Sequence, residues 1–146
     1  MESVQIFSLE KQISDLKMIQ KGGIIKELKI IPSFRNKSVK LFEFKLLPAI
    51  IKTSLGNIDY DFSKYKIRIK YNNNSIPITH IIAPYIVPNA PHRYRNKSLC
   101  LYKQSNFQWT NNNSLAKDIV PLIMMWIYFY EDWLVSNVWK GDEAEH

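Results

Sequence analysis

The chain has 146 residues, of which 46% are hydrophobic and 23% are charged. This length suits a single domain over residues 1–146, and the hydrophobic share excludes an intrinsically disordered chain. Lys and Arg number 20 against 13 Asp and Glu, and such a basic balance favours anionic partners such as nucleic acid, an acidic protein surface or a membrane face. The one cysteine excludes internal disulfides and multi-cysteine zinc sites.

The pattern of apolar residues shows neither a membrane anchor nor a secretion leader. The longest apolar run, residues 119–130, is shorter than the roughly 20 residues that a spanning helix needs. No charged leader followed by an apolar segment opens the chain, so we expect a cytoplasmic protein without a membrane partner. Many of the basic residues alternate with apolar ones, as lysines on the solvated face of a sheet also do. Nucleic-acid binding is therefore the less favoured interpretation of the charge.

The first half of the chain predicts one helix followed by four strands. Residues 8–21 carry apolar side chains at helical spacing, with Ser8 as the expected N-cap and Gly22-Gly23 as the stop. Short alternating runs joined by turns then predict an antiparallel meander. Its strands are expected at residues 24–31, 39–47, 65–71 and 76–83.

A long ordered loop and helices are predicted for the second half. Residues 84–110 form the loop, and loops of this length in compact domains are usually functional. Ser114 is expected to cap a helix from Leu115, with Pro121 inside it or at a break. The predicted fold class is α+β, with the C-terminal helices packed on one face of the sheet. The prolines that restrict the loop backbone are Pro84, Pro88 and Pro91.

Cys100 lies between two leucines within the predicted loop, and its residue type has two interpretations. One is a buried cysteine that acts as a small hydrophobe, because free cysteine is among the most buried residue types. The other is a nucleophile, because a thiolate attacks acyl groups and carries them as a thioester. This second interpretation needs a thiol at a mouth in the protein surface. Basic residues upstream would favour the thiolate if they lie close to it: His92, Arg93, Arg95 and Lys97.

The sequence around and after Cys100 has the arrangement of a known enzyme family. Leu99-Cys100-Leu101 is followed by Gln108-Trp109-Thr110 and then by the apolar helix predicted from Leu115. This arrangement, and the order of helix, four strands, loop and helices, resembles the ubiquitin-conjugating enzyme (E2) family. The resemblance covers most of the chain in element order and residues 85–123 in residue detail. It implies that Cys100 is the active-site cysteine and accepts the C-terminal carboxyl group of a partner protein.

The family's His-Pro-Asn triplet before the cysteine is absent, and two residues compete for its place. Asn89, in Val87-Pro88-Asn89, keeps the Pro-Asn pair but lies far upstream. His92 is preferred, because divergent bacterial members of the superfamily often keep a histidine without the asparagine. The resemblance implies that His92 braces the loop or polarises the thiol or the thioester carbonyl. An ordinary solvated or hydrogen-bonded loop histidine is the alternative.

The C-terminal residues resemble the end of a bacterial branch of this superfamily. Residues 130–134 and 139–146 are similar to conjugating-enzyme-like proteins of antiviral operons, especially cyclic-oligonucleotide-based anti-phage signalling systems (CBASS). This resemblance implies a partner whose C-terminus is carried on Cys100, either a cGAS-like nucleotidyltransferase or a ubiquitin-like protein. It implies no cofactor and no metal, and activation of the carboxylate falls to a separate enzyme or a pre-activated donor. Glu143 and His146 are weaker candidates for the cysteine loop.

Two other functions stay open at this point. One is a non-catalytic interaction module of the same fold, against which the retained cysteine argues. The other is a basic adaptor for nucleic acid, with cations on phosphates and aromatic rings stacked on bases. The residues for that adaptor would be Arg93, Tyr94, Arg95, Lys97, Tyr102 and Lys103.

Overall fold

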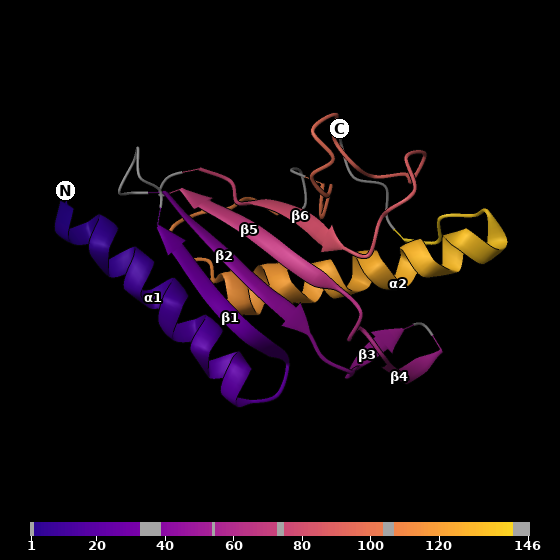
Figure 1. Ribbon diagram of the computed structural model, residues 1–146, viewed down its shortest axis with the longest axis horizontal. Coiled ribbons are helices and arrows are strands. Elements are labelled where there is room, and N and C mark those ends of the chain that lie inside the picture. Colours follow the sequence, from indigo (N-terminus) through magenta and orange to yellow (C-terminus); the bar gives the residue numbers. More distant parts are fainter. Residues whose placement is uncertain (1, 33–38, 54, 73–74, 104–106, 142–146) are drawn as a thin grey trace.

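The structure is a computed structural model that describes residues 2–32, 39–53, 55–72, 75–103 and 107–141. Figure 1 shows two α-helices, six strands and a long loop. A single π-helical turn (Leu115–Ile119) precedes the second helix. The elements are α1 (Glu2–Lys21), β1 (Ile25–Pro32), β2 (Val39–Leu46), β3 (Ala49–Thr53), β4 (Gly56–Tyr60), β5 (Lys66–Asn72), β6 (Ile78–Ala83) and α2 (Val120–Ser136).

The four predicted strands form one antiparallel sheet in the order β1-β2-β5-β6. This confirms the α+β class and the four-stranded meander. Two further strands, β3 and β4, pair as a separate hairpin between β2 and β5, and the sequence analysis did not predict them. Figure 1 shows this hairpin beyond the ends of the sheet strands. Its strands escape prediction because apolar and polar residue types do not alternate there: Ile50 and Ile51 are adjacent in β3, although burial itself alternates along that strand.

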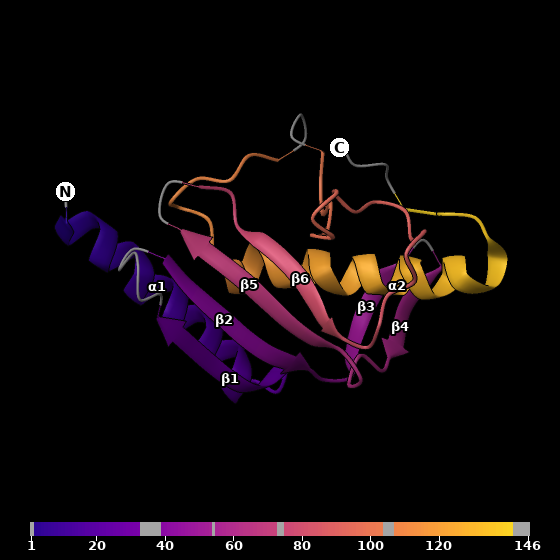
Figure 2. The ribbon, with the colours of Figure 1, turned by 45° about the horizontal axis from the view of Figure 1, so that its top comes forward.

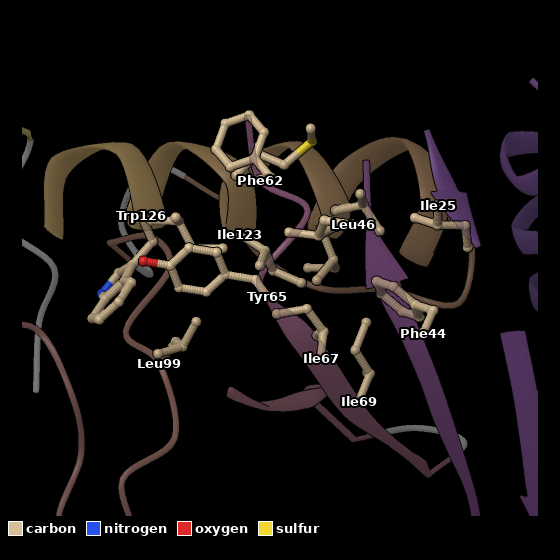
Figure 3. Packing of buried hydrophobic residues seen from close by; sticks show 14 of the residues in the cluster. Ile25, Phe44, Leu46, Phe62, Tyr65, Ile67, Ile69, Leu99, Ile123 and Trp126 are labelled. Atoms are coloured by element: carbon tan, nitrogen blue, oxygen red, sulfur yellow. The ribbon is translucent and has the colours of Figure 1, made fainter. Parts of the chain in front are cut away.

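One face of the sheet forms the core with α2. Phe42 and Phe44 of β2 are opposite Ile69 and Ile67 of β5, and all four side chains are fully buried. Burial of each such side chain contributes about 1.5–3 kcal/mol. Figure 3 shows Ile123 and Trp126 on α2 facing these strands. The alternation read from the sequence therefore predicts the buried face correctly.

The C-terminal helical region is one continuous stretch, so the prediction of several helices is wrong for the part of the chain described. Ser114 is the N-cap, as predicted, and its Oγ accepts a hydrogen bond from the Lys117 amide at 3.2 Å. Pro121 lies in the first turn of α2, directly after the π-helical turn, where the helical hydrogen-bonding pattern changes. The helix consequently continues through Pro121 instead of breaking.

This helical stretch, residues 115–136, is longer than the apolar run at residues 119–130 that argued against a membrane-spanning helix. By length and composition alone it is a candidate membrane span. The same residues supply the core, however, because Ile123 and Ile127 are fully buried within the cluster beneath the sheet. A helix that packs against a sheet in this way needs an apolar composition for that reason alone.

Helix α1 lies alongside β1 at one edge of the sheet (Figures 1 and 2). Its start was predicted wrongly, since the helix begins at Glu2 and Ser8 lies within it, hydrogen-bonded through its hydroxyl to the Tyr71 hydroxyl at 2.6 Å. The buried Gln12 amide donates to the Asn113 carbonyl at 2.9 Å and accepts from the Leu115 amide at 2.8 Å. These two bonds fix the start of the C-terminal helical stretch against α1.

A carboxylate on α2 ties that helix to the β3–β4 hairpin and the start of β5. Glu131 accepts hydrogen bonds from the hydroxyls of Tyr60 and Tyr65, the second at 2.5 Å, and pairs with Lys64 at 2.9 Å. Burial alone would raise the pKa of Glu131, but these donors outweigh it and lower its pKa. Burial and the Glu131 carboxylate raise the pKa values of both tyrosines.

Candidate active site

Cys100 lies in a short hairpin within the long loop, here named the cysteine hairpin (residues 92–100). Its backbone bonds run from the Cys100 amide to the His92 carbonyl at 3.0 Å and from the Tyr94 amide to the Ser98 carbonyl at 2.9 Å. Asn96 stabilises the turn, because its side-chain oxygen accepts from the Ser98 amide at 2.9 Å and the Ser98 hydroxyl at 2.6 Å. The predicted loop is thus ordered around the cysteine.

Two anchors fix the cysteine hairpin to the rest of the fold. The Leu99 amide donates to the Thr79 carbonyl on β6 at 2.9 Å. On the other side, the buried indole Nε1 of Trp126 on α2 donates to the His92 carbonyl at 3.0 Å. Figure 3 shows Leu99 and Trp126 near the hydroxyl end of Tyr65. The cysteine is therefore held between the sheet edge and the central helix.

The predicted surface position of the Cys100 thiol is wrong. Only 3% of the residue is exposed, as expected for the interpretation of Cys100 as a small buried hydrophobe. Burial raises the pKa of the thiol, and a hydrogen bond from the Tyr94 side chain acts in the opposite direction. The upstream basic residues do not contribute to this shift, so the expected thiolate-favouring environment is not present in this conformation.

A surface pocket, here named the neutral pocket, includes the residue that hydrogen-bonds the thiol. That residue, Tyr94, is 37% exposed and forms part of the pocket wall. The pocket has a volume of about 380 Å³, and charged side chains are absent from its lining within the part of the chain described. Its walls are Ile76, Pro77, Ile78, Tyr94, Asn96, Ser98, Leu99, Leu101 and Tyr102.

His92 is opposite Cys100 in the hairpin, and the contact between them runs through the backbone. The His92 carbonyl accepts both the Cys100 amide and the Trp126 indole, with the residue in a left-handed conformation at φ 59°. Its ring is 7% exposed and lies 4.7 Å from the ring of Trp139, centroid to centroid. His92 is therefore not solvated, whereas the alternative of an ordinary hydrogen-bonded loop histidine stays open beside the predicted bracing role.

The other residues named from the sequence are spread more widely. Asn89 is exposed in a turn closed by a bond from the Ala90 amide to the Val87 carbonyl. Glu143 and His146 lie outside the described residues. Tyr102 packs edge-on against Phe107 with ring centroids 4.6 Å apart, so it is not an open platform for a base.

Two residues of this site were not assigned to it from the sequence. Tyr94 was considered only as a stacking residue, and Trp126 was assigned no role in the site. The asparagine in the turn is the signal that could have placed Tyr94 beside Cys100, because it favours a tight reversal between them. No local signal connects Trp126 to His92, which lies 34 residues earlier in the chain.

Within residues 2–32, 39–53, 55–72, 75–103 and 107–141, no three His, Cys, Asp or Glu side chains cluster so as to hold a metal ion. The chemistry available at Cys100 is consequently that of a thiol, a tyrosine hydroxyl and fixed backbone groups. Such a set can carry an acyl group once the thiol is uncovered and deprotonated.

Comparison with known proteins agrees with this geometry. The family described as Type II CBASS E2 protein matches residues 40–146, which include β2 to β6, the cysteine hairpin and α2. No curated protein matches the chain. The match extends over more than half of the sequence, so the chain belongs to the Type II CBASS E2 protein family.

Proposed function

We propose that Cys100 carries the C-terminus of a partner protein as a thioester. The family places the chain in an E2-like role in a CBASS system. Within that role, we propose a cGAS-like nucleotidyltransferase or a ubiquitin-like protein as the acyl donor. The observation that carries the proposal is the position of Cys100, the chain's one thiol, on a hairpin fixed by β6 and α2.

The buried thiol requires a local opening before it can react. Tyr94 supports this step, because it hydrogen-bonds the thiol and also forms the wall of the neutral pocket. Rotation of this one side chain would connect Cys100 with the surface while leaving the hairpin bonds intact. Solvation of the uncovered thiol would remove the burial that raises its pKa.

The proposed transfer begins from an activated carboxyl group, either a thioester or an acyl-adenylate, made by a separate enzyme. The Cys100 thiolate attacks the carbonyl carbon, a new S–C bond forms, and the bond to the activating thiol or AMP breaks with departure of that group. An amine then attacks the Cys100 thioester. The amide forms, the amine nitrogen loses a proton to solvent, the C–S bond breaks, and Cys100 leaves as a thiolate.

His92 has a positioning role in this proposal. Its carbonyl accepts both the Cys100 amide and the Trp126 indole, which fixes the backbone of the nucleophile relative to α2. Reactions of this kind are sensitive to displacements of about 1 Å in the attacking group. Loss of the brace is expected to slow transfer more than it weakens donor binding.

The pocket beside Tyr94 indicates what kind of tail reaches the thiol. Its walls are aliphatic, aromatic or neutral polar, so they favour an uncharged segment over one carrying acidic or basic residues. A slim tail that contains glycine fits the narrow approach to a loop-borne thiol.

The test is to incubate the full chain with the protein encoded beside it and a source of activation, followed by intact-mass spectrometry. An adduct of the two proteins, absent in Cys100→Ala, is expected. A matched control is Ser63→Ala, which leaves the thiol in place and changes an exposed residue outside the hairpin and the neutral pocket. An adduct that persists in Cys100→Ala would refute the proposal.

Burial of the thiol favours one second candidate, a non-catalytic interaction module of the same fold. That function needs no opening, and it leaves Cys100 as a core residue with a raised pKa. It predicts stable binding of the partner without an adduct, both in the natural chain and in Cys100→Ala. The same mass measurement, combined with a binding assay, separates the two functions.

A further inference from the structure

A second pocket lies between β6 and the cysteine hairpin, here named the basic pocket. It has a volume of about 390 Å³ and is separate from the neutral pocket, with Asn96 and Leu99 forming walls of both. Its lining combines basic side chains with aliphatic and aromatic ones, and it has no carboxylate among the residues described. The basic members are Arg68, His80, Arg93 and Lys97.

Two of these basic groups already have partners. Arg68 donates through Nε to a Glu43 carboxylate oxygen at 2.6 Å, and its Nη2 lies 2.5 Å from the same oxygen. His80 Nε2 lies 3.0 Å from the Asn96 carbonyl. The positive charge of Arg68 is therefore offset within the sheet, and His80 is held against the hairpin.

The other two cations have no counter-ion in the part of the chain described. Lys97 is exposed and makes no ion pair there. Arg93 donates through Nη2 to the Val87 carbonyl at 2.9 Å, while its buried Nε has no acceptor among the described residues. Both cations line the same pocket, so a carboxylate of a partner would meet two unpaired positive groups.

We propose that the basic pocket binds an acidic side chain of a partner protein together with an aliphatic residue beside it. A charge-assisted contact to two unpaired cations suits one carboxylate. The aliphatic walls, which include Ile81 and the 39% exposed Ile82, bury the neighbouring side chain and offer no hydrogen bonds to a phosphate or a sugar. Nucleic acid normally engages several unpaired cations, more than this pocket has.

This site goes beyond the proposed thioester chemistry, since it concerns where the partner docks and not where it reacts. The basic pocket lies on the other side of Leu99 from the neutral pocket. It favours an acidic residue, whereas the neutral pocket favours uncharged ones. A partner with an acidic-aliphatic segment upstream of an uncharged tail would match both pockets. Binding in the basic pocket is measurable without acyl transfer, so failure of either proposal is recognised separately.

The test is an NMR titration of the full chain with two blocked peptides, acetyl-Leu-Glu-Leu-amide and acetyl-Leu-Gln-Leu-amide. The glutamate peptide is expected to shift the Arg93 Nε–H signal saturably at millimolar concentration, as suits a fragment, and the glutamine peptide to bind about fivefold more weakly. Lys97→Asn should weaken binding of the glutamate peptide by a similar factor. Asparagine is the chosen replacement because it tolerates the φ of 70° at this position. Arg95→Asn is the matched control, with the same charge change in the same turn but outside the pocket, and it should bind normally.

The proposal would be overturned by equal binding of the two peptides, by equal losses in the two variants, or by no saturable shift at all. Further arms with inorganic phosphate and AMP test the competing ligand chemistry. Tighter binding of either compound than of the glutamate peptide would assign the pocket to phosphate-bearing ligands and would also refute the proposal.

Discussion

The position of Tyr94 beside the Cys100 thiol leads to a prediction that thiol labelling can test. If Tyr94 is the side chain that closes the thiol, Tyr94→Ala should open it permanently. Tyr94→Phe should keep the ring but lose the hydrogen bond to the thiol. Because the chain has one cysteine, the reaction rate with the thiol reagent DTNB reports on Cys100 alone.

The size of the effect follows from the interactions that the Tyr94 side chain loses when it rotates away from Cys100. One hydrogen bond contributes about 1 kcal/mol, and the buried part of the ring adds about 1 kcal/mol, for roughly 40 Å² of apolar surface. Opening thus costs about 2 kcal/mol, so Tyr94→Ala should label roughly thirtyfold faster than the natural chain. Tyr94→Phe should label about fivefold faster, since it loses only the hydrogen bond.

Tyr85→Ala is the control for this experiment, because Tyr85 is 77% exposed and lies in the basic pocket. Its labelling rate should equal that of the natural chain. A rate for Tyr94→Ala within about twofold of the natural chain, in a protein of unchanged stability, would refute the reasoning. Some other element would then have to control access to Cys100.

Three further predictions concern stability, measured by urea unfolding. Gln12→Leu should lose about 2–4 kcal/mol, because the Asn113 carbonyl and the Leu115 amide lose their buried partner. Glu131→Gln should lose about 1–2 kcal/mol near neutral pH. The lowered pKa of Glu131 means that its contribution is present above the ordinary value of 4.5 and is lost as the pH falls through the folded pKa, so the acid loss of stability should be smaller in this variant. Trp126→Phe should lose about 2 kcal/mol and speed DTNB labelling, since the indole no longer holds the hairpin.

Matched controls separate these contacts from general effects of substitution. Lys11→Met removes an exposed contact to the Asn112 carbonyl beside the Gln12 site and should cost under about 0.5 kcal/mol. Asp132→Asn removes the exposed pair with Lys140, with a similarly small expected cost. Trp109→Phe removes an indole N–H that has no partner in the described part of the chain. Controls that cost as much as the test variants would contradict the assigned contacts.

The central strand β5 could be predicted from the sequence because burial along it follows the alternation of apolar and charged residues. Ile67 and Ile69 are buried, while Arg68 and Lys70 between and beside them are not. In β3 the residue types do not follow the burial, because Ile50 is 68% exposed while the adjacent Ile51 is buried. Alternation indicates a strand only where one face is covered.

The candidate site could be predicted only in part. The prolines before Cys100 predicted an ordered loop, and the resemblance to the E2 family implied a role for His92 beside Cys100. The burial of the thiol depends on what folds over it, and the hairpin turn that brings Tyr94 to Cys100 joins residues six positions apart. The brace from Trp126 depends on the tertiary packing of α2, for which local sequence has no signal. An apolar context such as Leu-Cys-Leu is compatible with either a core cysteine or a nucleophile.

The most direct measurement of the central claim is the sensitivity of the partner adduct to a thiol reductant. The adduct on the natural chain should disappear on treatment with dithiothreitol, because a thiol exchanges with a thioester. The corresponding adduct on Cys100→Ser should survive, since an oxygen ester resists that exchange. An adduct on the natural chain that survives the reductant would contradict a thioester at Cys100.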